Sequence, residues 1–399
     1  MPKALIVGGG VAGPAAALFL RRAGWDVEIF EARPAPDAFG GLFLNVATNG
    51  LAVLDTLGVK KRLLEDGHLC PYMVMSSGRG RILGTVPNGP AGEPARGSVV
   101  VRREWLNTVL REATEAEGIP LTWGARLDRI GERATGVVAH FSDGSQAAGD
   151  ILIGCDGVGS PTRRWINPSA PEPTYSGLLS IGGFARVEGL APTPLTQHMV
   201  FGARGFFGYL VRDDGTVYWF ANPAREEMDR DELRAVPSAT WVDELRALHA
   251  ADPYPVPQIL EHTTGTVGAY GIYDLPHVPL WHRGRVVAVG AAVHATSPSA
   301  GQGASLALED AATLALCLRE KRDHAEAFAR YQELRQRRAE EVVAYSRALS
   351  RQKTVTSSRI AVLIRDALLP LFLRNARKDT RNNHLYDHTI PEAPPTLDA

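Results

Sequence analysis

The sequence predicts an α/β fold: a Rossmann-like dinucleotide-binding domain, interrupted by an inserted antiparallel sheet and closed by C-terminal helices. Three observations predict it. A β-α-β pattern with a glycine-rich loop opens the chain, and alternating aromatic and β-branched residues dominate residues 173–280. A strand-like stretch at 285–289 then precedes two long helical stretches. A β-α-β unit builds a parallel sheet, whereas period-two alternation around tight turns is typical of antiparallel strands.

The first unit begins with the apolar run 4–7, which fits a buried parallel strand. A glycine-rich loop follows, and residues 14–23 have helical composition up to Gly24. A second strand is expected at 25–30. Further along, we predict helices at 49–57, 103–117, 304–321 and 325–353, a hairpin around 141–145 and a strand at 151–153.

These patterns divide the chain into consecutive parts. The dinucleotide-binding domain is expected to begin in one segment and resume after the inserted sheet, with short elements near 70–100 contributing to the inserted side. The expected boundaries are 1–172 for the first segment, 173–280 for the antiparallel sheet, 281–353 for the second segment with long helices, and 354–399 for a C-terminal helix and tail.

The composition excludes several classes of protein. Hydrophobic residues make up 45% and charged residues 22%, and the formal net charge of −1 argues against nucleic-acid binding. The three cysteines, Cys70, Cys155 and Cys317, lie far apart and form neither a metal-ligand nor a disulfide pattern. The apolar start lacks a cleavage site, and no run approaches the roughly 18 apolar residues of a membrane span. We therefore expect a cytoplasmic protein without a metal.

Gly8, Gly10 and Gly13 have the spacing of a dinucleotide-binding loop. The first glycine allows a tight turn, the second lets the backbone approach a pyrophosphate, and the third lets helix and strand pack closely. Glu31, at the end of the second strand, suits the hydroxyls of an adenosine ribose. This loop alone leaves NAD and FAD open.

Two later segments resemble those of the FAD-dependent aromatic hydroxylases. The stretch 154–163 is similar to their G-A-D-G-x-x-S-x-x-R segment. The stretch 290–311 is similar to their G-D-A-A-H-x-x-x-P-x-x-G-Q-G-x-x-x-x-x-E-D-A segment. With the first loop, these motifs stand in the family's order across nearly the whole chain, which also resembles the family at Arg103 and at 385–387. The likeness is greatest to bacterial single-component monooxygenases, including tetracycline-inactivating and natural-product-tailoring members.

The resemblance implies a set of FAD contacts. Arg103 would reach the ribityl or pyrophosphate region, the Leu127 backbone the adenine, and Asp156 the pyrophosphate. The loop from Pro298 to Gly303 would lie over the isoalloxazine ring, where backbone N–H groups stabilise negative charge. The full set of expected cofactor-binding residues is Gly8, Gly10, Ala12, Gly13, Glu31, Arg33, Arg103, Leu127, Asp156, Gly290, Pro298, Gly301, Gln302 and Gly303.

One residue departs from the family motif. The family has Asp after Gly290, where its carboxylate accepts a ribityl hydrogen bond, and this chain has Ala291. A charge-assisted hydrogen bond contributes about 1.5–3 kcal/mol, so FAD binding is expected to be weaker by about one to two orders of magnitude. The absence of this carboxylate is compatible with weaker FAD binding, an altered flavin pose or a changed activity.

The resemblance implies a monooxygenase that uses NADPH or NADH as a transient reductant and O2 as the second substrate. Oxygen would pass from a flavin C4a-hydroperoxide to a small aromatic or polyketide-like molecule. The alternatives are an oxidase, dehydrogenase or reductase on the same scaffold, and a non-catalytic flavin- or ligand-binding homologue, which Ala291 suggests. A halogenase is disfavoured because no W-x-W-x-I-P stretch is present. The oligomeric state is left as monomer or homodimer.

Aromatic residues supply the candidates for the substrate pocket. Because side chains of a strand alternate between faces, half of them are expected to face the flavin. The candidates are Tyr72, Phe207, Tyr209, Phe220, Tyr270 and Pro298, with Phe206 and Tyr218 also considered. No catalytic side chain is assigned, since the cofactor carries the chemistry, and His294 is interpreted as structural. The stretch 360–373 is expected to be a helix packed across the two domains, with a membrane-surface helix as the alternative.

Overall fold

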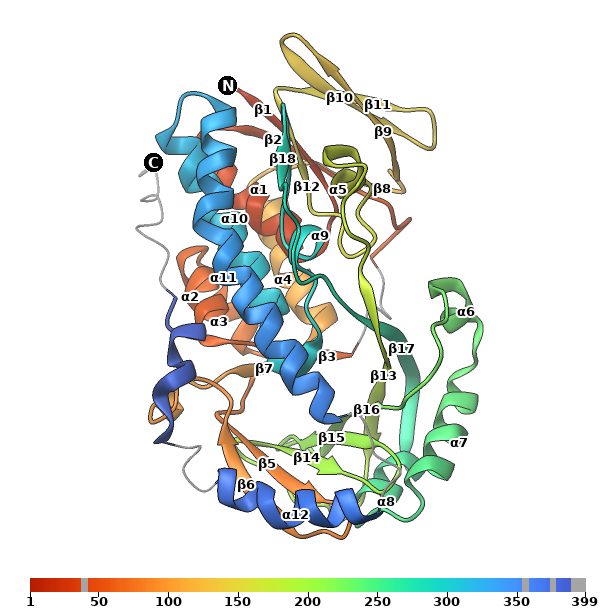
Figure 1. Cartoon of the computed structure of the whole chain (residues 1–399). Helices are drawn as coiled ribbons and strands as arrows, with labels where there is room; N and C mark the ends of the chain where they lie inside the picture. The colour runs from red at the N-terminus through yellow and green to blue at the C-terminus, as the bar shows by residue number, and fades with distance from the viewer. Residues whose placement is uncertain (37–41, 354–358, 374–377, 389–399) are drawn as a thin grey trace.

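The computed structural model describes residues 1–36, 42–353, 359–373 and 378–388 (Figure 1). A parallel sheet with its helices occupies one end of the molecule, and a larger, mostly antiparallel sheet occupies the other. Two long strands, β13 (Thr174–Arg186) and β17 (Thr263–Asp274), extend from the first part into the second.

The first part is built on a six-stranded sheet in the order β18-β19-β12-β1-β2-β8. Its strands pair in parallel except for β18 with β19, which is antiparallel. Residues 4–7 of the central strand are buried, as the apolar run predicts. The bounds are β1 Lys3–Val7, β2 Asp26–Glu31, β8 Leu121–Trp123, β12 Ile151–Gly154, β18 His282–Arg283 and β19 Val286–Ala288.

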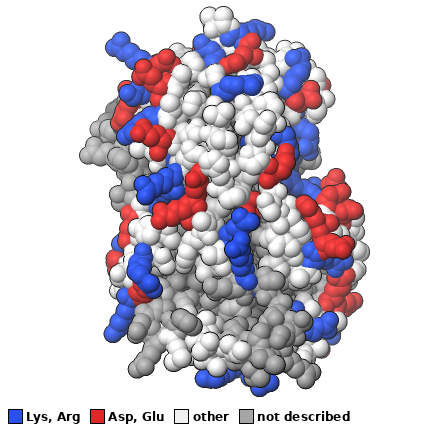
Figure 2. Space-filling model, in the orientation of Figure 1, with Lys and Arg blue, Asp and Glu red and all other residues white. Residues whose placement is uncertain are grey.

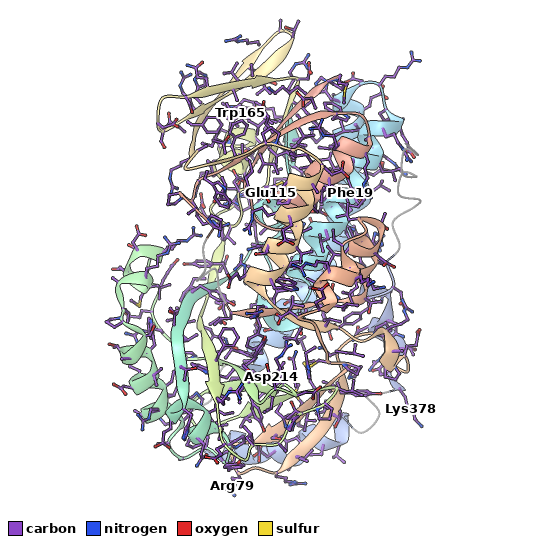
Figure 3. All side chains as sticks on the ribbon, turned by 180° about the vertical axis from the view of Figure 1, so that it is seen from behind. Phe19, Arg79, Glu115, Trp165, Asp214 and Lys378 are labelled. Atoms are coloured by element: carbon purple, nitrogen blue, oxygen red, sulfur yellow. The ribbon has the colours of Figure 1, made fainter. Side chains whose placement is uncertain are left out.

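Helices surround this sheet. Helix α10 is buried along most of its length because it packs against α1, α2 and α11. Phe19, labelled in Figure 3, belongs to the buried face of α1. The predicted helices are confirmed to within two residues. The bounds are α1 Ala12–Arg22, α2 Thr48–Thr56, α3 Lys60–Leu64, α4 Arg103–Ala116, α5 Pro161–Ile166, α9 Ala291–His294, α10 Gly303–Glu320 and α11 His324–Lys353.

Two three-stranded sheets complete the first part. The hairpin predicted at 141–145 is confirmed: Gly144 has a φ of 88°, a value that favours glycine, in the turn between the second and third strands of one sheet. The strands are β9 Leu127–Arg133, β10 Gly136–Phe141 and β11 Gln146–Gly149 in this sheet, and β3 Phe43–Val46, β4 His68–Leu69 and β7 Val99–Arg102 in the other.

The second part is a seven-stranded sheet in the order β17-β13-β16-β15-β14-β5-β6. Adjacent strands are antiparallel except for β14 and β5, which are parallel. The predicted antiparallel pattern therefore holds within 173–280, and residues 72–87 extend the same sheet. Figure 3 shows Asp214 at the turn between β15 and β16. The further bounds are β5 Tyr72–Ser77, β6 Ile82–Pro87, β14 Thr196–Phe201, β15 Phe206–Val211 and β16 Thr216–Asn222.

Both faces of this sheet are covered. Its outer face carries helices that the alternating pattern does not predict: α6 (Arg230–Ala235), α7 (Ser238–His249) and α8 (Val256–Glu261). Trp241 of α7 is buried together with Trp219 and Phe207 of the sheet. The inner face looks toward β3 and β7 of the first part, and Val100 of β7 packs there against Leu210 and Tyr218.

The C-terminal helix α12 (Arg359–Leu373) lies against the second part. It packs on β6, where a side chain at Gly84 would collide with Leu373, and Leu369 joins the apolar cluster containing Met73 and Met75. Leu369 and Leu373 also line the cavity between the two parts, and packing of this helix across both parts remains a prediction. Among the described residues, no helix has the length and apolar character needed to cross a membrane.

Candidate functional site

A cavity of about 2800 Å³ runs between the two parts of the molecule. At one end it is lined by the glycine-rich loop, including Gly8 and Gly10, and at the other by apolar side chains of the inner sheet face, including Phe206 and Phe220. A small-molecule pocket is usually about 300–1000 Å³. The cavity therefore has room for a dinucleotide and a second ligand in one continuous space.

The glycine-rich loop has the geometry that the sequence predicts. Gly8 has a φ of 114°, and a side chain there would lie 2.2 Å from the Cys155 carbonyl oxygen. At Gly13 a side chain would lie 1.9 Å from the Gly8 carbonyl oxygen, so this glycine lets α1 pack closely against β1. At Gly10, in contrast, a side chain would meet no atom within 4 Å. The open space at Gly10 leaves room for a phosphate beside the start of α1.

Glu31 closes the cradle at the end of β2. Its Oε2 accepts a hydrogen bond of 2.6 Å from the Gly9 N–H, and its Oε1 accepts from the N–H and Nε of Arg33 at 2.9 and 3.0 Å. Burial raises the pKa of Glu31, but the hydrogen bonds from Arg33 and Gly9 outweigh burial and lower it. Glu31 is therefore ionised at neutral pH, and its remaining lone pairs can accept ribose hydroxyls.

Asp156 lies in the second motif, on the cavity wall. Its Oδ2 accepts from the Thr162 N–H at 3.0 Å, whereas its Oδ1 is buried and has no hydrogen-bond partner among the described residues. Burial raises the pKa of Asp156 despite the hydrogen bonds from Ser160 and Thr162. A buried carboxylate oxygen without a partner is costly, so this atom is matched to a donor of a bound ligand.

Arg163 ties the second motif to the third. Its guanidinium is fully buried, and its Nη1 donates to the carbonyl oxygens of Val158 and Ala292, each at 2.9 Å. Because Ala292 follows the turn at Gly290, this arginine fixes the relative position of the two cavity-lining segments. The sequence motif contains Arg163, but only the tertiary structure shows that Arg163 contacts Ala292 and so links the two segments.

The third motif forms a loop and the start of α10. Gly301 has a φ of 65°, and a side chain there would lie 2.9 Å from Asn45 Nδ2. Pro298, Gly301 and Gly303 line the cavity, so the loop predicted to cover the isoalloxazine ring does face the space in question. Gln302 faces away from it: Gln302 Oε1 accepts from Asn49 Nδ2 at 3.0 Å.

A buried ionic network holds this loop from behind. The Gly290 N–H donates to Asp310 Oδ2 at 2.9 Å, and the same carboxylate contacts His294. Arg335 pairs with Asp310 at 2.7 Å and with Glu309 at 2.6 Å, and all three side chains are fully buried. Burial raises the pKa of Glu309, but Arg335 and Arg338 outweigh it and hold the pKa at about 2. His294 is thus part of the support of the loop, as the sequence interpretation expects.

The structure brings most of the expected cofactor residues to one cavity wall. Three of them act from behind it: Gly13 and Gly290 shape the backbone, and Gln302 supports the loop. Ala291, the residue that departs from the family motif, also lines the cavity. The expected residues among those lining it are Gly8, Gly10, Ala12, Glu31, Arg33, Arg103, Leu127, Asp156, Pro298, Gly301 and Gly303. Together with the unpartnered Asp156 oxygen, this set fits FAD.

Some of the predicted substrate-pocket residues line the cavity and others lie on the opposite face of the sheet, because side chains alternate along a strand. Phe220, Tyr270 and Pro298 line the cavity, as does Phe206. Phe207 and Tyr209 do not: they belong to the cluster on the outer sheet face, under α7 and α8. Tyr72 is also absent from the lining, which on β5 includes its neighbour Met73 and Met75. These three side chains lie on the opposite parity of their strands from the residues that line the cavity.

Sequence reasoning missed several lining residues. Met73, Met75 and Met199 form the apolar floor with Phe206 and Phe220. Asn45 of β3 accepts a 2.8 Å hydrogen bond from Gln197 of β14, which joins the two parts of the molecule across the cavity. Lys353 of α11 also reaches this end. The parity of β14 and β15 could have pointed to Met199, but nothing local in the sequence indicates Asn45 or Lys353.

The comparisons with known proteins decide the family. A model of the FAD binding domain matches residues 1–346. The chain belongs to this family of FAD-dependent monooxygenases. It is 31% identical over 347 residues to aurachin C monooxygenase/isomerase of Stigmatella aurantiaca, covering 86% of this chain and 87% of the relative. It is 29% identical over 356 residues to 6-hydroxynicotinate 3-monooxygenase of Pseudomonas fluorescens, covering 86% and 89%.

Solved structures of the family share the fold. The structure of Klebsiella pneumoniae HpxO with FAD and uric acid matches with a TM-score of 0.80 and 25% identity, covering 97% of this chain and 96% of that one. The tetracycline destructase Tet(51) matches with a TM-score of 0.70 at 19% identity, covering 98% of this chain and 100% of that one, a likeness of fold. This FAD-dependent oxidoreductase thus carries the dinucleotide cradle and the inner-sheet pocket on a single family scaffold.

Proposed function

We propose that this family member uses NAD(P)H and O2 to oxygenate a small aromatic molecule bound against the inner sheet face. The observation that carries the proposal is the continuity of the cavity. The phosphate cradle, the loop 298–303 and the pocket of Met199, Phe206 and Phe220 all line one cavity. An aromatic ring in that pocket would lie directly beside the ring system of a flavin held by the loop.

FAD, when bound, would supply the redox chemistry, which is acceptance of a hydride from the nicotinamide and activation of O2. The chain binds and orients. Glu31 and Asp156 offer carboxylate oxygens to hydroxyl donors, and the start of α10 at Gly303 presents backbone N–H groups toward the cavity. A helix N-terminus favours negative charge, which is the charge that a reduced flavin carries. The methionine and phenylalanine floor excludes water from the bound ring.

The proposal is tested with purified holoenzyme, NADPH and a panel of hydroxylated aromatic and N-heteroaromatic compounds under 18O2. The expected result is faster NADPH oxidation with one compound class, and one labelled oxygen atom in the product. Substrate-stimulated NADPH oxidation that leaves the product without label would overturn the oxygenation step. Loss of hydrogen from the substrate without label would identify an oxidase or dehydrogenase.

A non-catalytic homologue is the second candidate, and Ala291 is the observation that favours it. If the apoprotein does not bind added FAD, this residue has disabled the site. If FAD binds but NADPH and NADH do not reduce it with any member of the panel, the protein binds flavin without catalysis. Either result would contradict the monooxygenase proposal.

A further inference from the structure

One charged side chain of the aromatic end has no place in the function proposed so far. Lys353 ends α11, and with Tyr345 and Leu349 it lines the cavity. These residues are spaced by four, so they share one face of the helix. That face forms the wall of the pocket opposite the sheet strands β15 and β16.

The position of Lys353 is fixed relative to the flavin loop. One turn earlier on α11, Ser350 Oγ lies 2.7 Å from Ser297 Oγ and 2.8 Å from Ser299 Oγ. Ser346 Oγ donates to the Ser297 carbonyl oxygen at 2.7 Å. These hydrogen bonds clamp the end of α11 to the segment that leads into the loop 298–303. The helix end that carries Lys353 is therefore tied to the loop that faces the flavin.

The surroundings of the ammonium group are apolar and aromatic. Its Nζ lies 4.6 Å from the centroid of the Phe206 ring and 5.5 Å from that of Phe220. The cluster around these rings contains Met199, Met73 and other apolar side chains. Within the described part of the chain, no carboxylate forms an ion pair with Lys353. Burial alone lowers the pKa of Lys353 to about 8, so the cation is poorly solvated and would gain from an anionic partner.

The other cations of the cavity lie elsewhere. Among the described lining residues, Arg33, Arg103 and Arg126 line the dinucleotide end. Arg164, Arg230 and Arg234 also line the cavity, and all three are exposed. Arg381 is paired with Asp379. Figure 2 shows basic and acidic side chains interspersed over the visible outer face, so no general positive field explains an isolated lysine inside. Lys353 is the cation that the fold presents to a ring lying on Phe206 and Phe220.

We propose that Lys353 is a specificity-determining residue that binds an anionic group, a carboxylate or an ionised ring hydroxyl, of an aromatic substrate. The inference rests on the proposed function and narrows its substrate class. The two phenylalanine rings would hold the ring system, and the ammonium would donate to the anionic oxygen. Because a nearby cation favours the charged form, a ring hydroxyl bound there would ionise more readily than in water, which makes the ring richer in electrons.

The proposal is tested with two probes of matched shape. The first is 1-anilinonaphthalene-8-sulfonate, a fluorescent aromatic anion. The second is N-phenyl-1-naphthylamine, the same ring system without the sulfonate. Both are titrated into FAD-loaded holoenzyme, its Lys353→Met variant and its Lys353→Arg variant. Methionine keeps the length and apolar stem of the side chain, and arginine keeps its charge.

The expected result is that Lys353→Met weakens binding of the anionic probe about ten- to a hundredfold. Binding of the neutral probe should be unchanged, and Lys353→Arg should retain most of the affinity for the anion. The proposal is overturned if wild type binds the anion no more tightly than the neutral probe does, or if both probes lose affinity alike in Lys353→Met. The second pattern would mean that the lysine only props the pocket open.

The reductant is the other source of an anion, because NADPH carries phosphates. Stopped-flow reduction of the FAD by NADPH is therefore measured in wild type and Lys353→Met. Equal rates are expected. If reduction slows in the variant while probe binding does not change, the charge serves the reductant and the proposal fails. A wild type that discriminates between the probes but is never reduced would refute the proposed monooxygenase function and leave the anion site standing.

Discussion

Restoring the family carboxylate at position 291 is the most direct perturbation of the cofactor site. Ala291 is half-buried, lines the cavity and begins α9 directly after the turn at Gly290. In the Ala291→Asp variant, a carboxylate would face the space assigned to the ribityl chain. A charge-assisted hydrogen bond contributes about 1.5–3 kcal/mol, which corresponds to roughly a ten- to hundredfold lower Kd for FAD.

The structure sets the gain toward the lower half of that range. Asp156 also lines the cavity, so its carboxylate and the new one at position 291 would repel each other. Asp310, behind the turn, adds no such repulsion because Arg335 neutralises it. We therefore expect about a tenfold tighter Kd, measured by quenching of flavin fluorescence in titrations of the apoprotein. Ala291→Asn, which adds an acceptor without charge, should gain only about threefold. An unchanged or higher Kd for Ala291→Asp would refute the assignment of this position to a ribityl contact.

Further predictions follow from the same geometry. Arg335→Met removes the cation that Glu309 and Asp310 share, leaving Arg338 beside Glu309 and His294 beside Asp310. The variant should lower the free energy of unfolding by about 3 kcal/mol, as measured by urea denaturation at neutral pH. The pKa of Glu309 is lowered to about 2 in the folded protein. Its ionised carboxylate therefore stabilises the wild-type fold above the ordinary pKa of Glu, and this contribution is lost as the pH falls toward 2. A free energy of unfolding that stays unchanged over this acid range would contradict the role of the network. Glu31→Gln removes the charged acceptor of the Gly9 N–H and should raise the Kd for FAD about tenfold, checked by the same fluorescence titration. Gly13→Ala places a methyl group 1.9 Å from the Gly8 carbonyl oxygen, so the variant should purify without flavin; a yellow protein would show that α1 can move. Burial lowers the pKa of Lys353 to about 8, so the affinity for the anionic probe should fall as the pH rises through about 8. The affinity for the neutral probe should stay constant over the same range. Phe206 and Phe220, whose rings face the amine, do not titrate.

The dinucleotide cradle was predictable because each of its requirements is local. Gly8, Gly10 and Gly13 are separated by a fixed number of residues within one strand-turn-helix unit, so their spacing alone fixes the backbone path. The β-α-β pattern of the same unit predicts the parallel sheet. Gly290 and Gly301 were instead predicted from the resemblance to the family motif; both adopt positive φ angles, which favour glycine.

The substrate end was not predictable in this way. Period-two alternation shows that neighbours such as Phe206 and Phe207 point to opposite faces, but it does not say which face meets the cofactor. That information is usually carried by polarity, and here both faces are apolar because helices α7 and α8 bury the outer one. The C-terminal helix presents the same difficulty, as its apolar positions show that it packs but not on which sheet.

By itself, the sequence determined that this chain binds FAD on a Rossmann-like sheet and belongs with the flavin monooxygenases. Only the tertiary structure decided which aromatic rings meet the cofactor space and that Lys353, Asn45 and Gln197 stand beside them. The physical reason is distance along the chain. Phosphate recognition is built from backbone within one short unit, whereas the pocket is assembled from β3, β14, β15, β16 and α11, whose meeting point depends on how the two sheets pack.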